Sequence, residues 1–147
     1  MNIKVLHAYS YLGTARQPNL LMKILQVTSH LNPGGVTSST VSLCEALQER
    51  GHQVTIASER GQLEPRIHAR GMAHWRMPLH TSVEFSPQVL STCRVLATRL
   101  RNEVFDLIHA HTRVSQIVAG YLARATKRPY VTTWHGFFRR NLGRRFW

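Results

Sequence analysis

The chain is poor in acidic residues and in cysteine. Among its 147 residues Asp106 is the only aspartate, and six glutamates complete the acidic set. Paired-carboxylate hydrolysis and aspartate-rich metal sites are therefore disfavoured. The two cysteines, Cys44 and Cys93, lack the C-x-x-C spacing, which excludes a zinc ribbon or disulfide framework readable from the sequence and indicates a reducing compartment.

Long hydrophobic runs are also missing. No stretch of about 18 apolar residues occurs, and the N-terminus lacks the compact apolar core of a secretory signal. We therefore expect a cytoplasmic protein without a membrane span. The length fits a single domain of about 150 residues.

Positive charge, in contrast, is abundant. Lysine and arginine number 19 against seven acidic residues, which gives a net charge of +12, and 16 of the basic residues are arginine. After Asp106 the chain has eight basic residues and no acidic one. This surplus indicates an anionic partner, such as an anionic membrane surface or a nucleic acid, or else a solvated basic face.

Strand and helix patterns alternate along the chain. Short apolar runs with β-branched residues predict strands, and apolar residues at helical spacing predict helices between them. The expected strands cover 22–29, 53–58, 73–79, 105–110 and 129–134. The expected helices cover 36–50, 63–71, 87–104 and 114–126. This order predicts an α/β fold with a doubly wound, parallel, Rossmann-like sheet, which binds ligands beyond the carboxyl ends of its strands.

Two of these helices have a clear apolar face. Ser86 followed by Pro87 predicts a capped start for the third helix. Its expected core positions are Val89, Leu90, Cys93, Leu96, Ala97, Leu100 and Val104. Those of the fourth helix are Val114, Ile117, Val118, Tyr121, Leu122 and Ala125. We expect both helices to pack these faces inward.

The first strand leads through Asn32, Pro33, Gly34 and Gly35 into a helix. Backbone N–H groups and the positive helix terminus can bind a phosphate there, and glycine allows its close approach. A plain tight turn is the alternative. The G-x-G-x-x-G fingerprint and the P-loop spacing are absent, which argues against NAD binding and nucleotide hydrolysis, and against a ribose-binding role for Glu59 after the second strand.

Three histidines follow or end predicted strands. His109 and His111 are two residues apart, so their side chains share one face of a strand and either line a cleft or serve the structure. No third ligand for a metal is evident beside them, so the sequence predicts no metal site. His135 precedes Gly136, which leaves room for a ligand next to an imidazole that can donate to an anion or a hydroxyl.

Five sequence segments, in this order and spacing, are similar to the amino-terminal domain of family 4 glycosyltransferases. They are Met22-Lys-Ile-Leu-Gln-Val-Thr-Ser, Asn32-Pro-Gly-Gly-Val, Leu47-x-x-x-Gly51-His52-x-Val54, Phe105-Asp-Leu-Ile-His109-Ala-His111 and Pro129-Tyr-Val-Thr-Thr-Trp-His135-Gly136. The resemblance covers about residues 22–138. It implies the GT-B architecture, in which two Rossmann-like domains enclose a cleft, and sugar transfer from a nucleotide-sugar donor with retention of configuration.

The resemblance also implies roles for individual residues. Gly34 and Gly35 are expected to approach the donor diphosphate, and His135 to contact the donor sugar or act in catalysis. The residues expected to line the cleft or contact the acceptor are Asn32, His109, His111 and Gly136. The implied acceptor is a lipid-linked or polysaccharide intermediate of the cell envelope, at the inner face of the cytoplasmic membrane. No cofactor is implied, and nucleic acid is a poor candidate partner.

Two parts of the chain depart from this resemblance. Residues 1–21 are expected to be an extra segment or an overcalled start, and residues 22–147 an acceptor-side domain that is incomplete at its C-terminus. The donor-binding domain, with its Glu-x7-Glu element, has no counterpart here, so we expect a truncated chain that is inactive alone. The alternatives are a basic binding module, a relic without function and, among enzymes, a nucleotide-sugar epimerase.

Overall fold

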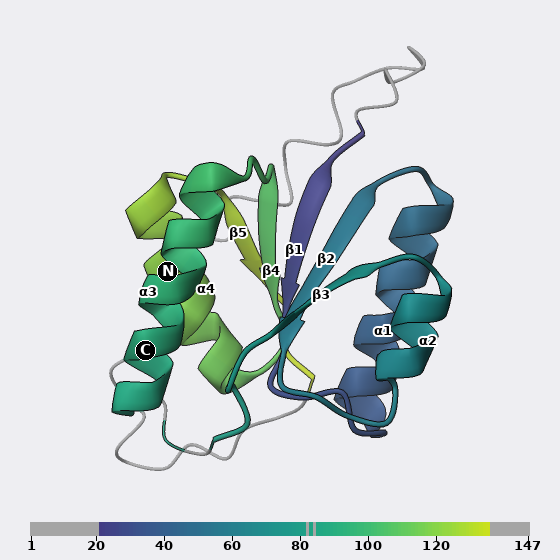
Figure 1. Cartoon of the computed structure of the whole chain (residues 1–147), viewed down its shortest axis with the longest axis horizontal. Helices are drawn as coiled ribbons and strands as arrows, with labels where there is room; N and C mark the ends of the chain where they lie inside the picture. The colour runs from purple at the N-terminus through teal and green to yellow at the C-terminus, as the bar shows by residue number, and fades with distance from the viewer. Residues whose placement is uncertain (1–20, 82, 84, 136–147) are drawn as a thin grey trace.

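Five parallel strands form a single sheet in the order β3-β2-β1-β4-β5 (Figure 1). The computed structural model describes residues 21–81, 83 and 85–135. The strands are β1 (Lys23–Val27), β2 (Gln53–Ser58), β3 (Ala73–Arg76), β4 (Leu107–Ala110) and β5 (Tyr130–Thr132). All four neighbouring pairs run parallel. The predicted doubly wound α/β sheet is confirmed.

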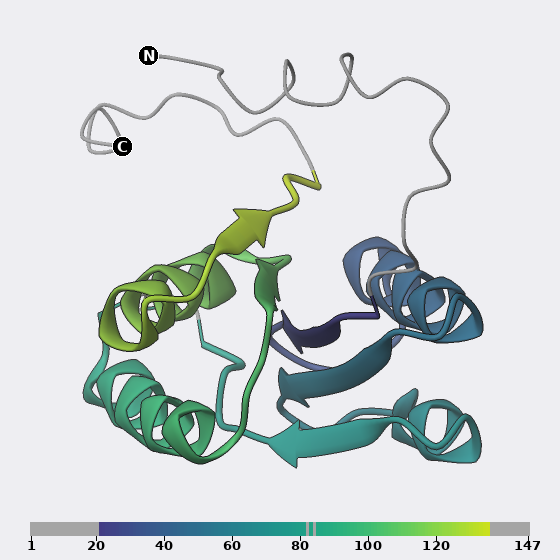
Figure 2. The ribbon, with the colours of Figure 1, turned by 90° about the horizontal axis from the view of Figure 1, so that it is seen from above.

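Helices cover both faces of this sheet (Figure 2). The pair α1 (Gly35–Glu49) and α2 (Glu64–Ala69) lies on one face, and the pair α3 (Pro87–Asn102) and α4 (Arg113–Thr126) lies on the other. Side chains alternate along the strands accordingly: Val54 and Ile56 join the core under the first helix pair, and Ala57 joins the core under the second. None of the described helices has the length and hydropathy needed to cross a bilayer.

Side-chain caps explain where α3 and α4 begin. Ser86 accepts a hydrogen bond from the Val89 backbone N–H at the start of α3, and Pro87 occupies the first turn, as the sequence predicts. At the start of α4, Thr112 and Ser115 form a reciprocal capping box. Both devices satisfy N–H groups that a helix leaves without an internal partner.

Parts of the predicted helix faces are wrong. Leu90, Val104, Tyr121 and Ala125 are exposed rather than buried. Val104 lies beyond the end of α3 at Asn102. The other three lie outside the stripe of α3 or α4 that faces the sheet and the neighbouring helix. The other positions expected in the core of α3 are buried.

Four of the five predicted strands are longer than the observed ones, whereas the strand predicted over 53–58 has the bounds of β2. Pro78 has no backbone N–H, so β3 ends before it, although Met77 and Leu79 remain buried. Phe105 lies outside β4, where it is fully buried with its ring 5.4 Å from that of Trp75. β5 forms only three paired positions with β4 and so is shorter than 129–134.

The strand order places a topological switch point between β1 and β4. From β1 the chain passes to α1 on one face, and from β4 it passes to α4 on the other (Figure 1). The carboxyl ends of these strands therefore flank the position where ligands bind in open α/β sheets. The predicted extra segment lies outside the described residues except for Leu21, and so do Gly136 and the basic, aromatic end of the chain.

Candidate functional site

The loop after β1 is fixed by the loop after β2. The backbone N–H of Leu63 donates to the carbonyl of Leu31 at 2.9 Å, and the backbone N–H of Asn32 donates to His30 Nδ1 at 3.1 Å. Gly61 packs directly against this loop, because a Cβ atom there would lie 2.0 Å from the Leu31 carbonyl carbon. The approach to α1 is therefore set by backbone contacts that allow no side chain at position 61.

The N-terminus of α1 is open. Gly34 is the N-cap residue in an extended conformation, no side chain caps the helix, and its first turn has no acidic residue. A Cβ atom at Gly34 or Gly35 would meet nothing within 4 Å. The backbone conformation at Gly34 is one that any residue adopts, so the backbone does not require glycine there. The effect of Gly34 and Gly35 is to leave the space before α1 free of side chains. The positive end of α1 is thus accessible to an anion.

Three histidines, one in β4, one just after β4 and one beyond β5, come together at the switch point. The rings of His109 and His111 are 4.1 Å apart, and those of His111 and His135 are 5.6 Å apart. His109 Nε2 lies 2.7 Å from Thr133 Oγ1. His111 is buried, whereas His135 is exposed. The shared face predicted for His109 and His111 is confirmed.

A chain of hydrogen bonds determines which ring nitrogens carry protons. His111 Nε2 lies 2.7 Å from Oε1 of buried Gln26, so this nitrogen donates and His111 Nδ1 is left as an acceptor. His135 Nε2, at 3.3 Å, then donates to His111 Nδ1. The other ring nitrogen of a neutral His135, Nδ1, is consequently an acceptor, and it becomes a donor to an anion only when His135 is protonated.

Burial keeps the inner histidines neutral. Burial, with the neighbouring His109 and His135, lowers the pKa of His111 to about 3. The pKa of His109 is lowered as well, by burial and by His135. At neutral pH the two rings therefore act as hydrogen-bonding groups and not as cations.

A second group of side chains lies at the ends of β1, β2 and β3. The His30 and His80 rings meet edge to face at 4.6 Å, and Glu59 Oε2 accepts from the His80 backbone N–H at 3.2 Å. Burial and His80 lower the pKa of His30, against the opposing effect of Glu59. Glu59 therefore follows β2 as expected, but its carboxylate positions the residue after β3.

Several residues of the site were missed by the sequence analysis. Gln26 is fully buried in an otherwise apolar strand segment, and its Nε2 has no hydrogen-bond partner in the described part of the chain. A polar side chain within such a run is itself a signal of a buried network. Thr133 and His80 carry no comparable signal, because only the folded sheet brings them to their partners.

Other reactive groups lie apart from this edge. Asp106 Oδ2 accepts from the Lys23 backbone N–H at 2.7 Å, just ahead of β4, so its carboxylate does not join His109. Burial raises the pKa of Cys44 to about 12 and that of Cys93 to about 11, which leaves both thiols protonated. A group that could hold a metal ion is formed by Glu64, His68 and His74, from α2 and β3.

Comparisons with known proteins agree with this fold. The model of Glycosyltransferase Family 4 matches residues 33–147. A glycosyltransferase from Rickettsia africae ESF-5 has a TM-score of 0.70 at 21% identity, over 84% of this chain and 32% of that chain. Anabaena HepE in complex with UDP-glucose has a TM-score of 0.55 at 18% identity, over 76% and 28%. Acinetobacter baumannii MurG has a TM-score of 0.58 at 13% identity, over 75% and 34%.

These matches define the extent of the similarity. The chain spans about a third of the length of each of these solved structures. At such low identities the likeness is one of fold. No curated protein matches the sequence significantly.

Proposed function

The chain belongs to glycosyltransferase family 4, and from this premise we propose that it forms the acceptor-side domain of a retaining GT-B enzyme that transfers a sugar from a nucleotide-sugar donor. Family membership favours this function over the nucleotide-sugar epimerase that shares the general fold. Transfer itself is assigned to the two-domain enzyme, since this chain spans only part of the proteins it matches.

One observation carries the proposal: the open N-terminus of α1 and the histidine chain lie at the same edge of the sheet, on either side of the switch point. The first turn of α1 has neither an acidic side chain nor a side-chain cap, so a donor diphosphate finds N–H groups without a competing carboxylate. The space in front of Gly34 and Gly35 admits a phosphate that a side chain would exclude.

His135 is the proposed catalytic residue of this domain. Its Nε2 lies 3.3 Å from His111 Nδ1, and His111 is held in turn by Gln26, which supports a role for the second ring nitrogen, Nδ1, in contacting the donor. In the neutral state Nδ1 accepts from a sugar hydroxyl, and in the protonated state it donates to the departing diphosphate. His111 and Gln26 act through His135 and are positioning residues.

The acceptor and the site of action complete the proposal. A lipid-linked or polysaccharide acceptor of the cell envelope would meet this domain at the inner face of the cytoplasmic membrane, near Asn32, His109 and Gly136. The net charge of +12 supports contact with anionic lipid. Vesicle co-sedimentation at rising salt tests this part separately, because electrostatic docking weakens as salt screens it.

UDP-glucose, the ligand of Anabaena HepE, is the probe for the donor site. We expect its addition to shift the backbone amide signals of Gly34 and Gly35 and the ring signals of His135, whereas uridine without the diphosphate leaves the glycine signals in place. Unchanged glycine amides at saturating UDP-glucose overturn the diphosphate assignment.

A matched pair of variants separates a specific site from general attraction to a basic protein. Gly35→Val places methyl groups in the open space before α1 and is expected to abolish the shifts. Gly120→Val, in α4, also enters open space and leaves them unchanged. Binding that falls steeply with salt but survives both Gly35→Val and His135→Ala identifies the basic binding module instead.

A further inference from the structure

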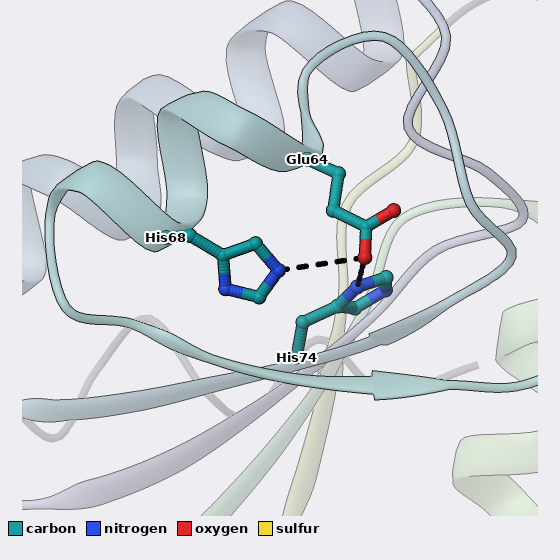
Figure 3. Close-up of side chains that lie close together, drawn as sticks. All are labelled: Glu64, His68 and His74. Carbon is teal, nitrogen blue, oxygen red and sulfur yellow. Dashed lines mark hydrogen bonds and ion pairs between the residues drawn. The ribbon is translucent and has the colours of Figure 1, made fainter.

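A carboxylate and two imidazoles converge between α2 and β3. Glu64 and His68 are one turn apart on α2, and His74 extends from β3 toward them (Figure 3). Glu64 Oε1, His68 Nε2 and His74 Nδ1 lie within 4.8 Å of one another. None of these residues belongs to the proposed donor site.

The distances from the carboxylate match those of a zinc site. Glu64 Oε1 is 3.4 Å from His68 Nε2 and 3.2 Å from His74 Nδ1. Zinc bonds of about 2.0–2.1 Å at tetrahedral angles hold neighbouring ligand atoms roughly 3.4 Å apart. Two imidazoles and one carboxylate, with water in the fourth position, are also a ligand set that zinc uses in proteins.

The orientation of His74 is the second observation. Its side chain is 0% exposed, and its Nε2 lies 3.0 Å from Ser58 Oγ and 3.3 Å from the Ser58 carbonyl oxygen. When the Ser58 Oγ proton is donated to the Glu59 carbonyl at 3.0 Å, both Ser58 oxygens are acceptors for His74 Nε2, which then carries the proton. Metal-binding histidines are held in this way, with the second ring nitrogen donating to a backbone carbonyl.

The consequence concerns His74 Nδ1. In the neutral tautomer with its proton on Nε2, this atom has a lone pair, which faces the carboxylate oxygen of Glu64 at 3.2 Å. Two lone pairs at this distance repel each other unless a cation lies between them or the ring takes up a second proton. A metal ion provides the cation and uses both lone pairs.

Arg76 competes for the same oxygen. Its Nε and a terminal guanidinium nitrogen lie 2.7 and 2.6 Å from Glu64 Oε1. The side chain is 53% exposed, so it can turn into solvent when the carboxylate binds a metal. His68 is 53% exposed as well and presents its Nε2 from the open side.

We propose that Glu64, His68 and His74 bind a zinc ion that joins α2 to β3, with water as the fourth ligand. The site is independent of the proposed transferase function. It fixes Ser58 through His74, and therefore steadies the end of β2 that leads to Glu59. The three ligands come from two elements, so the ion acts as a cross-link within one side of the sheet.

Zinc binding to the 147-residue chain tests the proposal by calorimetry. We expect one equivalent to bind saturably at neutral pH, and His68→Asn to weaken the affinity by at least about tenfold. His68 is half-exposed, so this variant keeps the fold, which circular dichroism verifies. An absence of saturable binding, or equal affinity in the variant, overturns the proposal.

His135→Asn is the matched control. It removes an exposed histidine from the other histidine group and is expected to leave the zinc affinity unchanged. If His135→Asn loses zinc binding and His68→Asn does not, the metal binds at the group of His109, His111 and His135. That outcome rejects the site at Glu64, His68 and His74.

Two further measurements distinguish a ligand role of His68 from a purely structural role: the absorption of bound Co²⁺ and the zinc affinity of an Arg76 variant. A purely structural role of His68 would leave both unchanged. Co²⁺ in the His68→Cys variant is expected to gain a thiolate charge-transfer band that wild type lacks, because Cys44 and Cys93 are buried. Arg76→Gln is expected to tighten zinc binding, since it removes the guanidinium that occupies Glu64 Oε1. No new band in the first variant, or weaker binding in the second, contradicts the proposed geometry.

Discussion

His111 Nε2 lies 2.7 Å from Oε1 of Gln26, a buried contact between residues 85 positions apart. This bond fixes the tautomer of His111 and, through it, the orientation of the exposed His135. A single side chain in β1 thus controls a ring at the mouth of the proposed donor site.

We predict that Gln26→Glu raises the pKa of His111 above its wild-type value. A carboxylate opposite Nε2 favours the imidazolium form, which the amide does not. The titration of the histidine ring protons, followed by NMR, measures the change. Gln53→Glu, an exposed position at the start of β2, makes the same change of charge and should leave His111 alone. Equal His111 titrations in the two variants contradict the contact between His111 Nε2 and the side chain at position 26.

The stability of the fold should decrease as the pH falls below about 6.5. The pKa of His111 is about 3 in the folded chain but close to 6.5 when unfolded, so over this interval the unfolded chain binds a proton that the folded chain does not. Each pH unit then costs up to about 1.4 kcal/mol of unfolding free energy for this group. Urea unfolding at pH 7.5, 6.5 and 5.5 measures the slope. In His111→Gln the slope should become shallower, and an unchanged slope would exclude His111 as its source.

Gly61→Ala is predicted to destabilise the protein by about 1–3 kcal/mol. The new methyl group would lie 2.0 Å from the Leu31 carbonyl carbon and 2.3 Å from the Asn32 nitrogen, so the loop that precedes α1 must move. Gly35→Ala is the control, because its methyl group enters open space. Thermal unfolding compares the two. A loss of stability in Gly35→Ala that equals the loss in Gly61→Ala would show that contact with the loop is not the cause.

Ser115→Ala is predicted to cost about 1–3 kcal/mol. The Ser115 hydroxyl accepts from the backbone N–H of His111 at 3.0 Å and from that of Thr112 at 2.7 Å. Its removal leaves the half-buried Thr112 N–H without this acceptor, whereas the His111 N–H keeps its bond to the Val27 carbonyl at 3.1 Å. Ser91→Ala, at an exposed position of α3, should be neutral or slightly stabilising because alanine favours helix. Urea midpoints of the two variants decide, and a neutral Ser115→Ala would refute the role of this hydroxyl in holding the end of β4.

The sequence predicts the fold well because the fold depends on local patterns. Each strand is a short apolar run, and Ser86 and Pro87 mark the start of α3 in the residues themselves. Strand ends were less predictable, since β5 extends only as far as β4 offers a partner and β3 stops at Pro78. Exposure at the helix margins, as at Leu90 and Tyr121, depends on how closely α3 and α4 pack together.

The candidate site was predictable in part. The spacing of His109 and His111 placed both rings on one face, and the structure brings His135 to them. The roles assigned to these residues remain predictions. Gln26, Gly61 and His74 depend on partners far along the chain or on another element, so no local pattern reveals them. The spacing of Glu64 and His68 is visible in the sequence. However, α2 has only six residues, which are too few for a hydrophobic pattern to show which of its faces is buried.

The central position of β1 also has a consequence for the order in which the sheet assembles. β1 pairs with β2 across a short interval, whereas its bond to the segment before β4, from the Lys23 N–H to Asp106, closes 83 residues. Local contacts form faster than distant ones because closing a long loop costs more entropy. The half built from β1, β2 and β3 is therefore expected to form first, and the docking of β4 limits the rate of folding. The switch point lies between β1 and β4, so we expect the site where ligands would bind to form late in folding.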